Sequence, residues 1–148
     1  MAKFIYKMEN ILGIKYKLED QAKTSYGIAR KKLMKEEERL SELITRLEEY
    51  QDKGKELRMQ KLDIMKLKEY TEASEIVKEE IKLQELAVKK AEQQVELARE
   101  RLNAAMLERK THEKLKENAR EVFFLEVASG ERKEIDELVS FRYNNPTN

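Results

Sequence analysis

Two runs of small or apolar residues, each repeating at steps of four and three, dominate the sequence. This spacing keeps one face of a helix in line and is the heptad seam of a coiled coil. Both runs far exceed the ordinary length of a globular helix. The first seam comprises Ala22, Tyr26, Ala29, Leu33, Glu36, Leu40, Leu43, Leu47, Tyr50, Gly54 and Leu57. The second seam comprises Tyr70, Ser74, Val77, Ile81, Gln84, Val88, Ala91, Val95, Ala98, Leu102 and Ala105.

A short segment near residue 60 separates the two seams. Gly54 weakens the first helix, and Asp63 is placed to cap the second by accepting a hydrogen bond from a first-turn N–H. Two helices joined by so short a turn fold back on each other in antiparallel orientation. We expect the first helix at about 4–57, the turn at about 58–63 and the second helix at about 64–128.

The facing residues of such a hairpin can be read from the sequence. In an antiparallel pair the position numbers of facing residues add to a constant, here about 120. In this register the one acidic seam residue, Glu36, faces the one seam glutamine, Gln84, and Tyr50 faces Tyr70. Alanine faces alanine twice, which lets the helix axes approach closely. The glutamine amide supplies the hydrogen-bond donor that a buried carboxylate needs.

The composition leaves little material for any other fold. Of the 148 residues, 41% are charged and 7% are aromatic, and there are only four glycines and one proline. So little apolar surface and so few turn formers exclude a sandwich or an α/β sheet, whereas this composition is typical of coiled coils. We therefore predict an all-α chain that forms one long antiparallel two-helix coiled-coil hairpin.

The charge pattern argues against nucleic acid as a partner. Thirty-one basic and thirty acidic residues are interspersed at short range and give a formal net charge of +1. A helix that binds nucleic acid needs a basic stripe able to displace several counterions.

Compartment signals point to the cytoplasm. The sequence has no cysteine, which excludes disulfides and thiolate metal sites. No apolar run approaches the roughly 18 residues that a membrane span requires. We expect a cytoplasmic protein that does not span a membrane itself.

No group of residues resembles a catalytic, cofactor or metal site. His112 is the single histidine and lies near the seam, so we expect a packed, half-exposed helix position, and no second His or Cys could complete a zinc site. The four glycines are isolated from one another, so no phosphate-binding loop is present. We expect neither enzyme activity nor a bound cofactor or metal.

The end of the chain departs from the seam pattern. The stretch "VFFLEV", residues 122–127, is the most apolar in the chain, and the register leaves it without a helix of its own chain to pack against. Ser129-Gly130 then interrupts the pattern. We expect a separate short helix at 131–142 and a disordered end at 144–148.

Two interpretations of this end stay open. An exposed patch with two phenylalanines generally marks an interaction surface. Alternatively, the short helix folds back over Gly130, so that its apolar stripe covers Phe123 and Phe124. That stripe consists of Ile135, Leu138, Val139 and Phe141.

Both ends of the chain resemble the flagellar export protein FliJ family. Residues 4–29, "FIYKMENILGIKYKLEDQAKTSYGIA", are similar to its entry segment, and "ERKEIDELVSFRY", residues 131–143, resembles its C-terminal signature. Between them, "EYTEASEIVKEEI" at 69–81 resembles the start of its second helix. The resemblance spans nearly the whole chain, and the ordered pair of ends at this length is its specific part.

The resemblance implies a soluble component of the flagellar type III export apparatus. Proteins of this family are similar in shape to the central stalk of rotary ATPases. They enter the ring of the flagellar export ATPase, promote its assembly, touch the membrane export gate and also contact export chaperones. The implied location is the cytoplasmic face of the cell membrane, reached only through partners, in support of flagellum assembly and motility.

The resemblance also gives positions for these contacts. The ATPase contact is carried over to Phe4, Met8, Glu9, Leu12, Glu19, Asp136, Glu137, Leu138 and Arg142, and the apolar patch adds Phe123 and Phe124. The export-gate contact is carried over to Leu43, Tyr50, Val77 and Gln84. Arg46 and Ala73 stand where aromatic residues occur in relatives, so the gate surface departs from the family pattern.

Two other functions remain as alternatives. A structural coiled-coil spacer would form an elongated parallel dimer along its length. An escort chaperone for export substrates would need a substrate groove, for which the sequence offers only the apolar tail.

Overall fold

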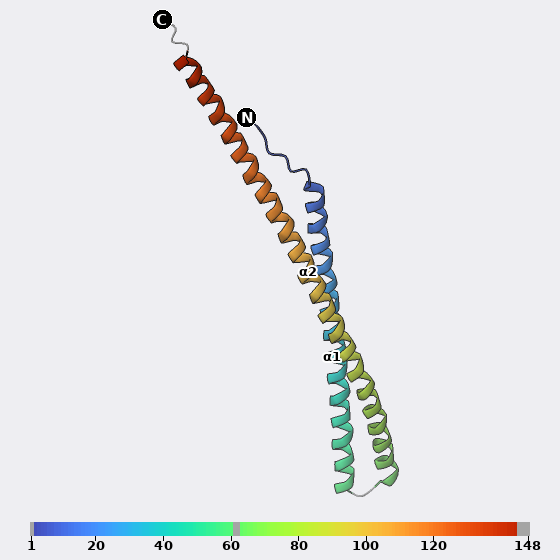
Figure 1. Ribbon diagram of the computed structural model, residues 1–148. Coiled ribbons are helices and arrows are strands. Elements are labelled where there is room, and N and C mark those ends of the chain that lie inside the picture. The colour runs from blue at the N-terminus through green and yellow to red at the C-terminus, as the bar shows by residue number, and fades with distance from the viewer. Residues whose placement is uncertain (1, 61–62, 145–148) are drawn as a thin grey trace. The chain divides into compact units, whose positions relative to one another are not determined.

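A computed structural model of the protein shows two α-helices in the part of the chain that it describes (Figure 1). The structure describes residues 2–60 and 63–144, and within these ranges it contains no β-strand. Helix α1 spans Glu9–Met59, 51 residues, and helix α2 spans Ile64–Asn144, 81 residues. The predicted all-α class and the hairpin of two long helices are confirmed.

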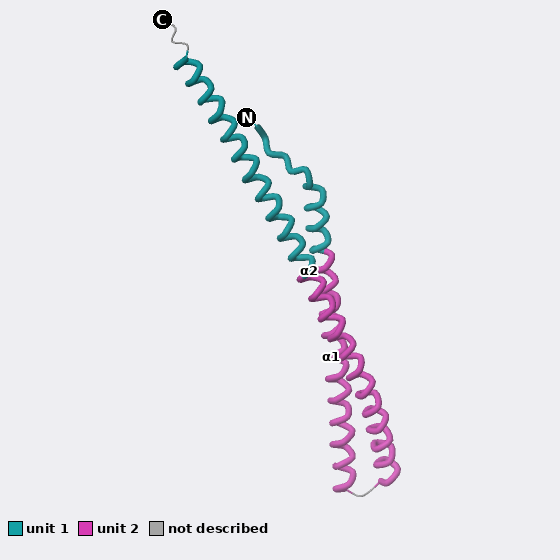
Figure 2. The backbone as a smooth tube through the Cα atoms, viewed as in Figure 1, with its two compact units in different colours: residues 1–20, 104–148 teal, residues 21–103 magenta. Residues whose placement is uncertain are grey.

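The helices divide into two compact units (Figure 2). Unit 2 is the hairpin, Gln21–Asn103, and unit 1 combines Met1–Asp20 with Ala104–Asn148. Each helix contributes to both units. The residues predicted to contact the ATPase all belong to unit 1, and those predicted to contact the export gate all belong to unit 2.

Local signals end α1 and begin α2 inside unit 2. Arg58 lies in the last turn of α1, where a positive charge is favourable at the negative end of the helix dipole. Asp63 caps α2 as predicted, because its Oδ1 accepts hydrogen bonds from the backbone N–H groups of Met65 at 3.2 Å and Lys66 at 3.4 Å. Positions 61 and 62 of the predicted turn lie outside the described residues.

The two predicted seams form the interior of unit 2. Every residue of the first seam, and every residue of the second seam that lies in this unit, is buried or half-buried. Glu36 and Gln84 meet as predicted, since Gln84 Nε2 donates to the backbone carbonyl of Glu36 at 2.9 Å and also to its carboxylate. The rings of Tyr50 and Tyr70 lie 6.1 Å apart. These two pairs confirm the antiparallel register.

In unit 1 the start of α1 packs against a later part of α2. Residues 2–8 are not helical, so α1 begins at Glu9 and not near residue 4. The interior is small, with Leu12 only 3% exposed. Among the half-buried residues of α2 that continue its seam are Lys116, Ala119, Phe123 and Val127.

The predicted separate helix at 131–142 is wrong, because α2 continues without a break to Asn144. Gly130 has no positive φ, and nothing lies within 4 Å of the place that a Cβ would take. A single glycine costs a helix only about 1 kcal/mol, which the long uninterrupted helix tolerates. Asn144 is thus helical, whereas 145–148 of the predicted disordered end lie outside the described residues.

The proposed cover of Phe123 and Phe124 by the stripe of 135–141 is therefore also wrong. All residues from Ala128 to Asn144 are exposed, and Leu138 is 61% exposed.

Within the described part of the chain, no helix is long and apolar enough to cross a membrane.

Candidate protein-binding surfaces

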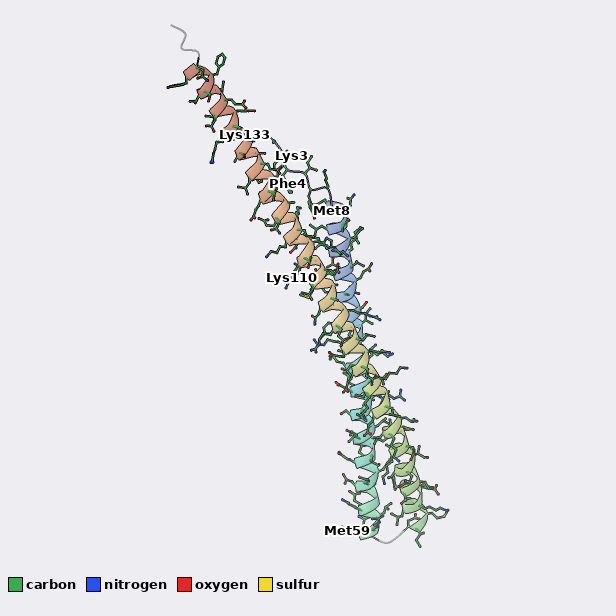
Figure 3. All side chains as sticks on the ribbon, in the orientation of Figure 1. Lys3, Phe4, Met8, Met59, Lys110 and Lys133 are labelled. Carbon is green, nitrogen blue, oxygen red and sulfur yellow. The ribbon has the colours of Figure 1, made fainter. Side chains whose placement is uncertain are left out.

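Aromatic side chains join the N-terminal segment to α2 (Figure 3). The ring of Phe4 lies 5.5 Å from that of Phe123, which in turn lies 5.4 Å from that of Phe124. Tilted pairs of this kind add about 0.5–1.5 kcal/mol to the gain from burial. The register left 122–127 without a helix of its own chain to pack against, and at Phe123 the non-helical N-terminal segment supplies the contact instead. A non-helical segment such as 2–8 advances up to about 3.3 Å per residue, against 1.5 Å in a helix, and so reaches further along α2.

A cleft of about 470 Å³ opens beside these rings. It brings together three of the predicted ATPase-contact residues, Phe4, Glu9 and Phe124, with Lys116 and Arg120. Glu9 forms an ion pair of 2.8 Å with Lys116, and the Arg120 guanidinium lies 5.6 Å from the centre of the Phe124 ring. The entry segment and α2 thus form one surface at this point.

Two other predicted contact residues lie inside unit 1. Leu12 is buried, and Glu19 is only 4% exposed. Arg109 Nε donates to Glu19 Oε2 at 2.6 Å, and its Nη2 donates to Oε1 at 3.3 Å. Such a two-pronged ion pair supplies the compensation that a buried carboxylate requires. The geometry gives both residues an internal role, and a direct contact with a partner stays a prediction.

Arg109 also organises a polar network with Tyr16 and Glu113. Its Nη1 donates to Glu113 Oε2 at 3.0 Å, and the Tyr16 hydroxyl donates to Glu113 Oε1. The hydrogen bond between Tyr16 and Glu113 raises the pKa of the Tyr16 hydroxyl and lowers the pKa of the Glu113 carboxyl. The hydrogen bond to Glu19 raises the pKa of Arg109. The contact between α1 and α2 in unit 1 is therefore formed largely by charged side chains, whereas the contact between them in unit 2 is mainly apolar.

Further pairs extend the network along the same helices. Lys15 Nζ lies 2.9 Å from Glu108 Oε2, and this hydrogen bond lowers the pKa of Glu108. His112 is half-buried, as predicted for a seam residue, and its Nδ1 finds no hydrogen-bond partner among the described residues. Within the described residues, no group of three or more His, Asp and Glu side chains could hold a metal ion.

The network was not predicted from the sequence, although Arg109 stands four residues after Ala105 and so continues the second seam. The positive charge of Arg109 at a seam position was the signal in the sequence that could have indicated the network. Helical side chains lean towards the N-terminus of their own helix, so Arg109 and Glu19 on antiparallel helices lean towards each other. Long side chains can therefore pair even when their position numbers do not add to the constant of about 120 that facing residues share.

The remaining predicted ATPase-contact residues are exposed. Met8, which directly precedes α1, is 50% exposed. Asp136, Glu137, Leu138 and Arg142 lie on the last turns of α2, where no other element of the described chain covers them. Figure 3 marks this stretch with Lys133 and shows it continuing beyond Lys3 and Phe4.

The predicted gate residues lie in the interior of the hairpin. Leu43, Val77 and Gln84 are buried, and Tyr50 is half-buried. Tyr50 also lines a cleft of about 400 Å³, which opens where the small residues Gly54 and Ser74 stand in the seams. A partner would reach the other three side chains only by opening the hairpin, and the gate contact stays a prediction.

Comparison with known proteins agrees with the resemblance seen at the two ends. A family model described as "Flagellar FliJ protein" matches residues 4–148. Comparisons with curated proteins and with solved structures gave no significant match. Because the family match covers nearly the whole chain, the protein belongs to the flagellar FliJ family and is thereby a component of the flagellar export apparatus.

Proposed function

We propose that this protein is the central stalk of the flagellar export ATPase, a non-catalytic subunit that binds the ATPase ring, promotes its assembly and couples it to the membrane export gate. The resemblance to the family suggests these finer roles. The observation that carries the proposal is the contrast between the two units. In unit 2 the seam residues of the two helices cover one another, whereas in unit 1 the last part of α2, from Ala128 onward, is not covered by any described part of the chain.

This last part of α2 carries apolar side chains. From Ala128 onward every described residue is exposed, among them the large apolar side chains of Ile135, Leu138, Val139 and Phe141, at 60–64% exposure. Contiguous exposed apolar groups on an otherwise highly charged chain indicate a surface that a partner covers. The cleft lined by Phe4 and Phe124 lies in the same unit, so both ends of the chain offer contacts to that partner.

The hairpin suits the body of a stalk. A two-stranded antiparallel coil is narrow, and it lacks the symmetry of a ring, so it presents different faces to different ring subunits. The intramolecular pairs Glu36–Gln84 and Tyr50–Tyr70 disfavour the spacer alternative, in which the seams would pair between two chains. A monomer in sedimentation is expected, and an elongated parallel dimer would favour the spacer.

The proposal assigns the gate contact to the outer surface of unit 2, around the cleft that Tyr50 lines. It also places the protein at the cytoplasmic face of the cell membrane, held there by its partners, where it supports flagellum assembly and motility. Contact with export chaperones belongs to the same proposal.

The test uses the cognate export ATPase, purified and mixed with the full chain. We expect the wild-type chain to raise both ATP hydrolysis and the fraction of hexamers, and the double variant Ile135→Ser/Leu138→Ser to lose most of this effect. The control is Leu107→Ser, which removes a leucine of similar exposure, 66%, elsewhere on α2. A wild-type chain without effect on the ATPase would refute the stalk role, and equal effects of all three chains would refute the placement of the contact.

A further inference from the structure

A row of residues on the last part of α2 has the heptad spacing of a coiled coil. Its steps alternate between four and three, so at about 100° per residue the row stays on one side of the helix. All of its residues are exposed, and from Ala128 onward no described part of the chain covers them. We name this row the terminal stripe, and it consists of Phe124, Ala128, Glu131, Ile135, Leu138 and Arg142.

The terminal stripe is not the seam that packs in unit 1. That seam includes the half-buried residues Phe123 and Val127. Continued at the same spacing, it would reach Gly130, Glu134 and Glu137, none of which offers an apolar side chain. The apolar face of α2 therefore changes after Val127, from one that its own chain contacts to one that its own chain leaves open.

The outer part of the terminal stripe is complementary to itself. One point of the helix lies halfway between Ile135 and Leu138 and also halfway between Glu131 and Arg142. A two-fold symmetric interface brings residue i of one copy onto residue j of the other, and j onto i. An antiparallel second copy centred on that point therefore places apolar side chains on apolar ones and each acidic residue on a basic one.

We infer that the terminal stripe binds the terminal stripe of a second copy of this chain. The two helices run antiparallel, with Ile135 against Leu138 and with Glu131 against Arg142. The observation that carries the inference is that one register matches both the apolar pair and the opposite charges. The inference goes beyond the proposed function, because it concerns the chain away from the ATPase. In this second state, another copy covers residues that are proposed to contact the ring.

The residues beside the terminal stripe permit this register. On one side of it, Arg132 comes next to Val139 of the second copy, and on the other side Glu134 comes next to Phe141. No like charges meet on either side. The exposed side chains of Val139 and Phe141 extend the apolar contact, since the aliphatic stems of Arg132 and Glu134 can lie against them while the charged ends stay in water.

Other arrangements of two copies match the terminal stripe less well. In a parallel pair, Glu131 and Arg142 each face their own copy, and like charges at such positions repel each other. An antiparallel shift of one heptad sets Glu131 against Ile135, and a shift in the opposite direction sets Arg142 against Leu138. In either case a charge faces an apolar side chain and loses its opposite charge.

The proposed contact is short, so the association is weak. From Glu131 to Arg142 the helix rises by about 17 Å at about 1.5 Å per residue. Interfaces of this small size are typical of transient complexes. The chain is therefore a monomer at low micromolar concentration, in agreement with the expected intramolecular hairpin, and it forms the dimer as its concentration rises.

Sedimentation equilibrium of the full chain, from about 10 μM to about 1 mM, measures the association without the ATPase. We expect a monomer–dimer equilibrium in the wild type, and Leu138→Ser should weaken it at least about tenfold. Leu107→Ser, which removes a leucine of similar exposure elsewhere on α2, is the control and should associate like the wild type. Circular dichroism should show equal helix content in all variants, because the replaced side chains are exposed.

Charge reversal tests the register itself. In the antiparallel pair, Glu131→Arg sets two arginines against each other and Arg142→Glu sets two glutamates against each other, so each variant alone should associate at least about tenfold more weakly. An equimolar mixture of the two variants should associate like the wild type, because each charge again faces its opposite. In a parallel pair, either reversal would only exchange one pair of like charges for another and would leave the association unchanged.

Three results would overturn the inference: no dimer at any of these concentrations, equal association of Leu138→Ser and the wild type, or a mixture of the two charge variants that associates no more tightly than each alone. These results are independent of the stalk role. If no dimer forms while the wild type stimulates the ATPase, the inference fails and the stalk role stands. If the dimer forms in this register while the wild type leaves the ATPase unaffected, the stalk role fails and the inference stands.

Discussion

The pair of Glu36 and Gln84 allows a sharp test of what holds the hairpin in register. Gln84 is only 7% exposed, and its Nε2 donates both to the backbone carbonyl and to the carboxylate of Glu36. Gln84→Leu keeps nearly the same volume, so little cavity forms, but it leaves the Glu36 carboxylate against an apolar side chain. Leaving a buried polar group without its partner costs about 1–3 kcal/mol, so we expect a loss of this size in the free energy of unfolding.

The double variant Glu36→Leu/Gln84→Leu should recover that loss. Replacing both members of a buried polar pair by apolar residues is nearly neutral or stabilising, whereas removing one member is not. Urea unfolding of the full chain, followed by circular dichroism, measures these differences, and Gln93→Leu on the exposed side of α2 controls for the change in helix propensity. If Gln84→Leu is as stable as Gln93→Leu, or the double variant no more stable than Gln84→Leu, the reasoning is refuted.

Three further predictions concern unit 1. Gly130→Ala should stabilise the last part of α2 by about 0.5–1 kcal/mol, seen as slower amide exchange there, and faster exchange would contradict an uninterrupted helix. The hydrogen bond between Tyr16 and Glu113 raises the pKa of Tyr16 and lowers that of Glu113, so its stabilisation is complete between the unfolded-state values of 4.5 and 10.0. It is lost as the pH falls through the lowered pKa of Glu113 or rises through the raised pKa of Tyr16, and Tyr16→Phe should flatten the alkaline side of a plot of Tm against pH. Phe4→Ala should release residues 2–8 and speed tryptic cleavage there, whereas Ile5→Ala, at a position 76% exposed, should leave the cleavage rate unchanged.

The hairpin was predictable because its signals repeat. Each seam residue indicates the same buried face of its helix, so the evidence accumulates along the chain. Once Asp63 places the turn, the pairing of Glu36 with Gln84 follows from the register. The error at 129–130 came from reading one serine and one glycine as a break. A helix interior tolerates such residues at a cost of about 1 kcal/mol, which neighbouring helical residues offset.

Unit 1 was harder to predict because its contacts do not repeat. Glu19 and Arg109 pair through long side chains, which reach across positions that a fixed register keeps apart. Phe4 reaches Phe123 only because residues 2–8 leave the helical path, and nothing in the seam pattern signals where the helix begins. The resemblance carried Leu12 and Glu19 over as contact residues, but it could not tell an interior position from an exposed one.

Amide hydrogen exchange of the full chain, free and mixed with the purified export ATPase, tests the central claim most directly. The proposed stalk role predicts that the ATPase slows exchange in residues 2–8 and 120–142 and leaves the interior of the hairpin, residues 21–103, unchanged. Protection confined to the hairpin, or no protection anywhere in the chain, would contradict it.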